Sequence, residues 1–272
     1  MGLPLADRNP YIGPRSFERE DRGVFFGRDD EVDALLSLII AHREVLLYAQ
    51  SGAGKTSLLG AGLIPRLEEE GFEVLPVTRV RGLIPSLGDA PQAANPYVWN
   101  VLLSWGEGLP DAEAALGGEV TLAQFLAQRP HPLGEDSFPK PRAAIFDQFE
   151  ELFREGSFHS YSDREHELAR FVNLLTNSVS HNNPDVYLVI ALRSDMITEC
   201  SGFRGFTNLI NGSSYMVSKM NSEAIREAIT GPVRITGAEI DNDLVELLVD
   251  EISRPDQQLP ILQHALMRTW LH

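Results

Sequence analysis

The sequence contains a single cysteine, Cys200, among 272 residues. One cysteine excludes an internal disulfide and a zinc site built from several cysteines. A lone thiol without a pairing motif is most often a small buried apolar residue, so we expect Cys200 in the core. The sequence also lacks an apolar run near the roughly 18 residues of a membrane helix. Its N-terminus has neither the basic nor the apolar region of a signal peptide. We therefore expect a cytoplasmic protein without a membrane partner.

Positive charge is scarce as well. The chain has 23 Lys and Arg against 39 Asp and Glu, a net charge of −16. This balance argues against nucleic acid as a partner, because nucleic-acid affinity depends on neutralising phosphates with Lys and Arg. Charges beyond a Debye length of roughly 8 Å are largely screened, so an ATP site needs only local cations. Lys55, Arg28 and Arg193 are the candidates.

The stretch 49–57, AQSGAGKTS, has the pattern of a phosphate-binding loop. An apolar run at 45–48 precedes it and a helix-like segment at 57–67 follows. In G-x-x-x-x-G-K-[ST], backbone N–H groups and a helix N-terminus bind the phosphates, and the lysine reaches the outer ones. A chance glycine-rich turn is the alternative, and the flanking strand and helix disfavour it. We expect a nucleotide contact from each loop residue: Gln50, Ser51, Gly52, Ala53, Gly54, Lys55, Thr56 and Ser57.

Two details of this loop matter for the chemistry. Ala49 stands where the pattern has its first glycine, which costs little if the residue is strand-like. The Thr56 hydroxyl is placed to bind Mg²⁺.

A second motif is the apolar run 143–147, which ends in Asp147. A buried parallel strand has this composition, and its carboxyl end is where ligands of α/β sheets bind. Asp147 would orient the Mg²⁺ shell, so Lys55 and Asp147 would meet around a Mg²⁺-bound triphosphate. The next residue, Gln148, can orient water but cannot accept its proton.

Glu150 and Glu151 are the candidate catalytic carboxylates. They return to the face of Asp147 if the chain turns helical at once. The alternative for each is a solvated helix charge. Because no carboxylate directly follows Asp147, we expect hydrolysis to be slow.

Strands and helices alternate along the chain from residue 29 to residue 218. A helix begins near Asp29 or Asp30, with an apolar stripe at Val32, Leu35, Leu36, Ile39 and Ile40. Further strands are predicted at 73–80, interrupted by Pro76, at 186–192 and at 215–218. A capping box of Ser162 and Glu165 predicts the start of a helix with apolar residues to 179. This alternation predicts an α/β fold with a parallel sheet and helices on both faces.

Nine of the seventeen prolines fall between Pro76 and Pro141. This density excludes one regular element, so we read about 81–141 as an insertion with short helices at 97–105 and 121–128.

A small helical lobe follows from about residue 219. We expect a helix at 222–230 ended by Gly231-Pro232 and another from Leu259 onward. Between them, Asp241 caps a helix whose stripe is Leu244, Leu247, Leu248 and Ile252. The chain ends inside the last helix, so we expect a fragment of a longer protein. The expected parts are an arm at 1–24, a core at 25–218 and the start of a lobe at 219–272.

Five strings along the chain together resemble the novel STAND NTPases, P-loop (ASCE) relatives of the AAA+ ATPases. They are NPY with FFGRDDE, QSGAGKTSL, DQFEELF, LRSD and LPILQHAL. The resemblance implies that the hhGRxxE motif, Phe25, Phe26, Gly27 and Arg28 with Glu31, packs near adenine. It implies that Arg193 senses the γ-phosphate and that Pro260 touches the base. The glycine usual two residues before this proline is Gln258 here.

The same resemblance implies an ATP-binding and slowly hydrolysing switch that uses ATP, ADP and Mg²⁺. ATP would favour a homo-oligomer, with sensor and effector domains outside this fragment. The alternatives are an AAA+-type remodelling ATPase acting on DNA or protein, and a nucleotide-stabilised scaffold without turnover. The string 218–221 lacks the Asp of the guanine-reading motif, which favours adenine. Arg204 is either an arginine finger acting in trans or a surface charge.

Overall fold

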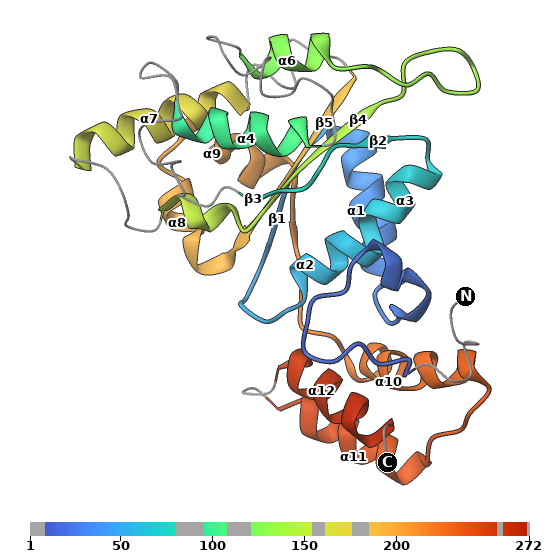
Figure 1. The fold of residues 1–272 in the computed structure, drawn as a ribbon. Coiled ribbons are helices and arrows are strands. Elements are labelled where there is room, and N and C mark those ends of the chain that lie inside the picture. Colours follow the sequence, from blue (N-terminus) through green and yellow to red (C-terminus); the bar gives the residue numbers. More distant parts are fainter. Residues whose placement is uncertain are drawn as a thin grey trace. The chain divides into compact units, whose positions relative to one another are not determined.

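A computed structural model of the chain describes residues 9–79, 95–107, 121–153, 161–175, 185–254 and 258–270 (Figure 1). Much of the predicted insertion, Val179 of the predicted helix and the side chains of Ser162, Glu165 and Arg204 lie outside the described residues. The chain divides into two compact units. The sheet unit is Ser37–Tyr48 with Leu67–Met216, and the loop–lobe unit is Met1–Leu36 with Ala49–Arg66 and Val217–His272. Each is described by itself, and the predicted domain bounds stay predictions.

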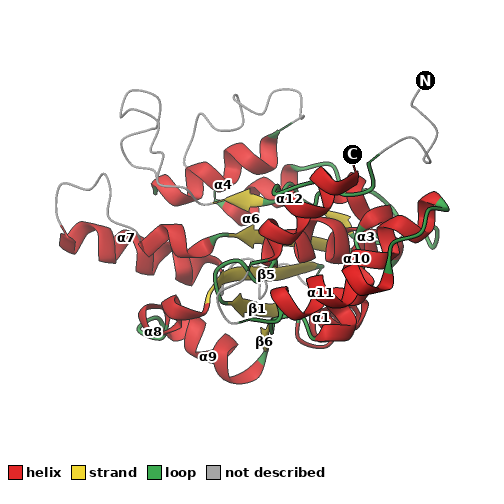
Figure 2. Cartoon of the chain, turned by 90° about the horizontal axis from the view of Figure 1, so that it is seen from below, coloured by secondary structure: helices red, strands yellow, loops and turns green. Residues whose placement is uncertain are grey.

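A parallel sheet of six strands lies in the sheet unit, and Figure 2 shows its strands side by side. The strands are β1 (Glu44–Ala49), β2 (Glu73–Val74), β3 (Thr78–Arg79), β4 (Arg142–Asp147), β5 (Val186–Arg193) and β6 (Ser214–Met216). Their order is β2-β4-β5-β1-β6. Strand β3 also pairs with β4, nearer to the carboxyl end of β4 than β2 does. The predicted parallel α/β sheet is confirmed. Because the strands are parallel, β1, β4 and β5 end at the same edge, with β5 between the other two.

The strand predicted at 73–80 is two short strands, β2 and β3, as the position of Pro76 indicated. Proline has no N–H to donate to a sheet ladder. Both pieces pair with β4, which places Glu73 beside Arg142 and Arg79 beside Asp147.

The core of the sheet unit is rich in aromatic side chains. The helices of this unit are α4 (Pro96–Gly106), α6 (Leu122–Gln128), α7 (Tyr161–Leu174), α8 (Ile197–Cys200) and α9 (Arg204–Gly212). Apolar side chains from these helices, β4 and β5 form one buried cluster. The two short helices predicted in the insertion are confirmed, with Asn95 and Thr121 as their N-caps. The prediction that Ser162 caps α7 is wrong, because Tyr161 is already helical.

Cys200 is buried in this cluster, as its lack of a pairing motif indicated. Burial raises the pKa of its thiol to about 12, with smaller contributions from Glu199 and Glu150. The thiol is therefore protonated at neutral pH.

The insertion is bonded to the edge of the sheet through buried Arg142. Its Nε donates to Glu73 Oε2 at 2.6 Å, and its terminal nitrogens donate to the carbonyls of Leu126 (2.8 Å) and Pro130 (2.7 Å). A buried guanidinium is tolerated when its donors find acceptors, so this network fixes α6 against β2 and β4.

The loop–lobe unit contains the phosphate loop and the three lobe helices. A helical run follows the loop as α2 (Lys55–Ser57), a π-helical segment (Leu58–Leu63) and α3 (Ile64–Glu69). The lobe consists of α10 (Ser222–Thr236), α11 (Asn242–Ile252) and α12 (Leu259–Trp270), and α1 (Asp29–His42) begins in this unit. The stripe of α1 is buried as predicted except for exposed Ile40, which lies at the margin of that stripe.

Helix α10 corrects one prediction. We expected it to end at Gly231-Pro232, but it continues to Thr236. Gly231 leaves room for the ring of Phe26, since an added Cβ would lie 2.5 Å from a ring carbon. Next to the proline, the Ile229 carbonyl accepts a hydrogen bond of 2.6 Å from the buried Tyr11 hydroxyl. These tertiary contacts offset the hydrogen bond that proline removes from a helix.

Helix α11 corrects another. Asp241 caps it as predicted, accepting from the N–H groups of Asp243 and Leu244. However, its buried residues are Val245 and Val249, whereas Leu247 is 63% exposed. At 100° per residue, the two valines and Leu248 share one arc and Leu247 lies outside it. The predicted stripe was therefore rotated away from the true packing face.

The arm that precedes α1 is ordered and ends in a 3₁₀ helix, Arg19–Val24. The Asn9 amide donates to the Met267 carbonyl at 2.9 Å, and the Tyr11 ring meets Trp270 edge-on at 6.4 Å. Further along, the Phe17 N–H donates to Ser57 Oγ at 3.1 Å. The arm therefore joins the lobe to the helical run that follows the phosphate loop.

Tyr11→Phe is expected to lower the free energy of unfolding by about 1–2 kcal/mol, because the Ile229 carbonyl loses its buried donor. Thermal unfolding followed by circular dichroism measures this change. Tyr187→Phe is the control, since within the described part of the chain its hydroxyl makes no hydrogen bond. Equal shifts in both variants would contradict a role for the Tyr11 hydroxyl.

No helix in the described part of the chain has the length and apolar character needed to span a membrane.

Candidate functional site

The phosphate loop leaves β1 at Ala49 and enters helix α2 at Lys55. Ala49 is the last residue of β1 and is buried, so alanine stands in strand conformation as predicted. Gly52 (φ 77°) and Gly54 (φ 90°) are left-handed, a conformation that favours glycine. The Ala53 N–H donates to the Gln50 carbonyl at 3.3 Å and closes a tight turn. The local sequence therefore forms the tight glycine turn that its pattern predicted.

The lysine of this loop is held inside it. Lys55 is 9% exposed, and its Nζ donates to the Ala49 carbonyl at 3.2 Å. Thr56 is partly exposed on the first helical turn. The Ser57 hydroxyl instead accepts the N–H of Phe17, so it holds the arm.

Arg28 is the centre of the hydrogen bonding around the loop. It is 4% exposed, and its guanidinium is paired with the carboxylate of Glu31. It also donates to the carbonyls of Ala53 (3.0 Å) and Ser218 (3.1 Å). Arg28 thus fixes the loop, the start of α1 and the segment before α10 to one another.

The other residues of the FFGR motif contact the arm and helix α10. Phe25 packs on Phe17, with ring centroids 5.2 Å apart. Phe26 packs on Gly231 of α10. Gly27 (φ 82°) lies against α10, where an added Cβ would be 2.3 Å from the Ala224 carbonyl oxygen. The motif therefore joins the loop to the lobe.

Gly27→Ala is expected to cost at least about 2 kcal/mol of unfolding free energy. The cause is a left-handed backbone combined with a clash against a helix carbonyl that cannot move away. Chemical denaturation measures the loss. Gly71→Ala is the matched control, since Gly71 is also left-handed (φ 86°) but has open space around its Cα. Equal destabilisation would contradict the close approach at Gly27.

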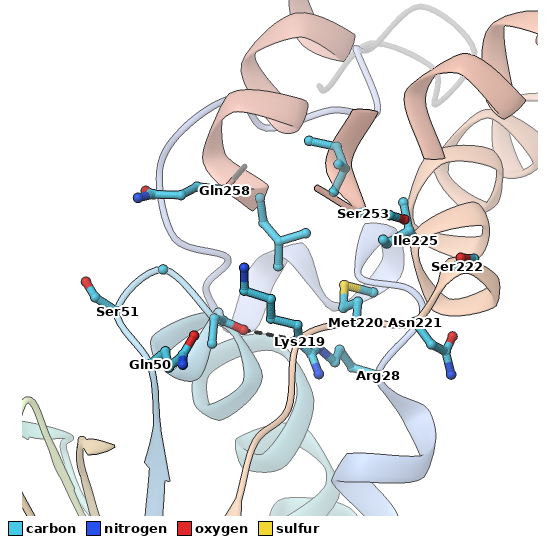
Figure 3. Close-up of a pocket in the computed structure, with 14 residues that line it drawn as sticks. Arg28, Gln50, Ser51, Lys219, Met220, Asn221, Ser222, Ile225, Ser253 and Gln258 are labelled. Carbon is cyan, nitrogen blue, oxygen red and sulfur yellow. Dashed lines mark hydrogen bonds between the residues drawn. The ribbon is translucent and has the colours of Figure 1, made fainter. Parts of the chain in front are cut away.

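A pocket of about 540 Å³ opens beside the loop (Figure 3). On one side it is lined by the residues Arg28, Gln50, Ser51, Gly52 and Ala53. On the other it is lined by Lys219, Met220, Asn221, Ser222, Ile225, Ile252, Ser253, Gln258 and Leu259. Of these lining residues, two are cationic and none carries a carboxylate. A protein with a net charge of −16 thus has a pocket suited to an anion.

Sequence motifs found one side of this pocket and only part of the other. Arg28 and the loop residues 50–53 were predicted and line it. The predicted residues that do not line it are Phe25, Phe26, Gly27, Gly54, Lys55, Thr56, Ser57 and Pro260. On the lobe side, Leu259 opens the LPILQHAL string and Gln258 directly precedes it. The other lining residues of that side came without a motif, apart from the weak likeness of 218–221 to a guanine-reading string.

The start of α12 lies against the phosphate loop. A Cβ added to Gly52 would be 3.4 Å from the Gln258 side chain, and one added to Gly54 would be 3.7 Å from Leu259. Pro260 is exposed in the first turn of α12, and its neighbour Leu259 lines the pocket instead. Gln258, which replaces the usual glycine, therefore places a carboxamide beside the loop.

In the sheet unit, Asp147 lies at the carboxyl edge and is 1% exposed. Its Oδ1 accepts the N–H of Gln148 at 2.9 Å, and Arg79 Nε is 3.9 Å from Oδ2. Gln148 has a positive φ of 56°, which is strained for a residue other than glycine. The backbone therefore turns sharply directly after the carboxylate.

The turn leads into a 3₁₀ helix, Phe149–Phe153, that carries both candidate glutamates. This is the immediate helical turn that the spacing of Glu150 and Glu151 required. Glu150 is 8% exposed, whereas Glu151 is partly exposed.

Arg193 ends β5 at the same edge and makes two hydrogen bonds to Asp195, at 3.0 and 2.6 Å. Asp195 raises the Arg193 pKa, and Glu150 and Glu151 raise it further. The four charged side chains therefore interact within the sheet unit.

Each unit contains one of the predicted oxygen donors for a magnesium ion, and each donor is considered by itself. Mg²⁺ prefers hard oxygen ligands, and the candidates are the Thr56 hydroxyl and the Asp147 carboxylate. Asp147 is almost fully buried, as a carboxylate that serves a cation can be.

Known structures with this fold are P-loop ATPases and replication initiators. A Walker-type ATPase of Pyrococcus abyssi matches with a TM-score of 0.56 and 16% identity, over 98% of this chain and 72% of that one. The ORC1 protein of Aeropyrum pernix, solved in complex with DNA, has a TM-score of 0.54 and 15% identity, over 92% and 62%. Domain III of the DnaA initiator from Thermotoga maritima has 0.51 and 14%, over 92% and 87%. At these identities the likeness shows the fold, and it confirms the predicted P-loop class.

No curated protein matches the chain. A family model described as Novel STAND NTPase 1 matches residues 10–272. The family suggested by the five sequence strings is therefore confirmed. This chain belongs to the novel STAND NTPases.

Proposed function

We propose that the chain binds ATP with Mg²⁺ and hydrolyses it slowly, as a molecular switch. The observation that carries this proposal is the pocket beside the phosphate loop, which has cationic lining residues and no carboxylate among them. Its apolar lining from Met220, Ile225, Ile252 and Leu259 suits a purine base, and the loop amides suit phosphates.

Four of the predicted residues have a direct role in this proposal. Lys55 would bind the outer phosphates in place of the Ala49 carbonyl. Thr56 and Asp147 would hold Mg²⁺, which neutralises phosphate charge and polarises the bond that breaks. Arg193 would exchange Asp195 for the γ-phosphate, because both partners offer oxygens suited to a guanidinium.

Contacts between the lobe and the phosphate loop would couple nucleotide binding to a change in the conformation of the lobe. Gln258 and Leu259 lie against the two left-handed glycines of the loop, and Arg28 bonds the loop to the segment before α10. A phosphate on the loop changes what these lobe residues contact. The nucleotide biases the lobe only by its different affinity for the two arrangements. We propose that this bias controls assembly into a homo-oligomer and signalling by sensor and effector domains.

The test is to titrate the purified chain with ATP and ADP in the presence of Mg²⁺, and to follow phosphate release. We expect saturable binding of both nucleotides and slow release of phosphate. Absence of binding would overturn the proposal. Binding without any release would favour the nucleotide-stabilised scaffold.

A remodelling ATPase that acts on DNA is the second candidate, because the ORC1 protein of similar fold was solved with DNA. The net charge of −16 weighs against it. Stimulation of phosphate release by DNA would favour this candidate over the switch.

A further inference from the structure

Lys219 is a cation at the pocket to which no sequence motif assigns a role. It is one of three lysines in the chain, with Lys55 and Lys140. It lies in the segment between β6 and α10 and lines the pocket. Figure 3 shows its side chain extending into the space between the loop, with Gln50 and Ser51, and Gln258.

The backbone on both sides of Lys219 is held in place. The Ser218 carbonyl accepts a hydrogen bond from Arg28 at 3.1 Å. The Met220 side chain packs against Gly27, where an added Cβ would lie 2.8 Å from it. Asn221 caps α10 by accepting the Ala224 N–H at 2.8 Å. These contacts fix the segment so that Lys219 faces the pocket.

The charge of Lys219 decides which part of a nucleotide it suits. Arg28, the other cation that lines the pocket, donates to Ala53 and Ser218 and is paired with Glu31, so its donors serve the loop and the segment before α10. An ammonium gains most from an anionic oxygen, whereas a purine base offers only neutral acceptors. We propose that Lys219 binds a phosphate oxygen of the nucleotide, as a second lysine beside Lys55.

This inference rests on the proposed nucleotide site and adds a residue to it. In this inference Arg28 is a positioning residue, because its hydrogen bond to the Ser218 carbonyl holds the backbone next to Lys219. Lys219 lies at the start of the lobe segment, so its bond to phosphate would connect the nucleotide to α10 as well as to the loop.

Lys219→Met in the full 272-residue chain tests the inference. Lys219 is exposed, so this change should leave the fold intact. Affinities for ATP, ADP and adenosine would be measured by displacement of a fluorescent ADP analogue at fixed Mg²⁺. We expect ATP and ADP to bind about tenfold more weakly and adenosine to bind unchanged, because only a charge-assisted bond to phosphate is lost. Lys219→Arg should retain most of the affinity.

Lys140→Met is the matched control. It removes the same charge from a residue that does not line the pocket, and we expect it to bind all three ligands as the unchanged chain does. If the unchanged chain binds no ATP, the proposed function itself fails. If it binds ATP and Lys219→Met binds equally well, only this inference is overturned. If adenosine weakens as much as ADP, the contact is with base or ribose, and the assignment to phosphate is wrong.

Discussion

Lys55→Ala is expected to lower the affinity for ATP by at least about a hundredfold, which amounts to abolished binding at ordinary concentrations. Lys55 is the buried ammonium inside a turn whose other contributions are backbone amides. A phosphate chain bound there without a cation would keep most of its negative charge in a partly dry site. Isothermal titration with ATP and Mg²⁺ measures the change.

The folded state needs its own control, because Lys55 also bonds the Ala49 carbonyl. Lys55→Met keeps most of the apolar stem and removes the charge together with the bond to Ala49, so we expect the same loss of binding. Thermal unfolding of this variant measures how much of the loss comes from the fold. If Lys55→Met bound ATP as the unchanged chain does, the loop would not be the phosphate site.

The parts of the site that the sequence predicted are those set by neighbours in the chain. Gly52 and Gly54 require left-handed backbone, and Lys55 opens the helix directly after them. The strand that ends in Asp147 is apolar from Ala143 to Phe146, as is typical of a strand buried on both faces. Each of these features follows from a short window of sequence.

The parts that were missed depend on residues far apart in the chain. The break expected at Gly231-Pro232 is absent because the ring of Phe26 and the hydroxyl of Tyr11 pack against that stretch of α10. Glycine and proline are strong local signals, yet here the glycine serves a tertiary contact. No local pattern distinguishes the two uses.

The part of the lobe side that contains Lys219 was missed for a similar reason. Lys219 faces the pocket because Arg28 and Gly27, nearly two hundred residues earlier, hold its neighbours. The sequence predicted that Arg28 lies near the nucleotide, and it carried no sign of what Arg28 positions.

Glu150→Gln is expected to slow phosphate release about a hundredfold and to leave ATP affinity nearly unchanged. Glutamine keeps the shape of the side chain and its ability to orient water, but it cannot accept a proton. Gln148 stands directly after Asp147 and cannot accept a proton, so the candidate acceptors are the two carboxylates of the 3₁₀ turn that follows it. Glu150 is the more buried of the two carboxylates there, and its charge acts on Arg193.

Release of phosphate in a single turnover, at saturating ATP, measures this change, and a binding titration runs beside it. Glu151→Gln is the matched control on the same turn, and we expect a smaller effect because its side chain is more exposed. A larger effect at Glu151 would exchange the two assignments. Equal turnover in both variants and in the unchanged chain would remove both glutamates from the mechanism. The attacking water would then have to give its proton to a phosphate oxygen of ATP instead of to a protein base, which is compatible with a slow hydrolysis.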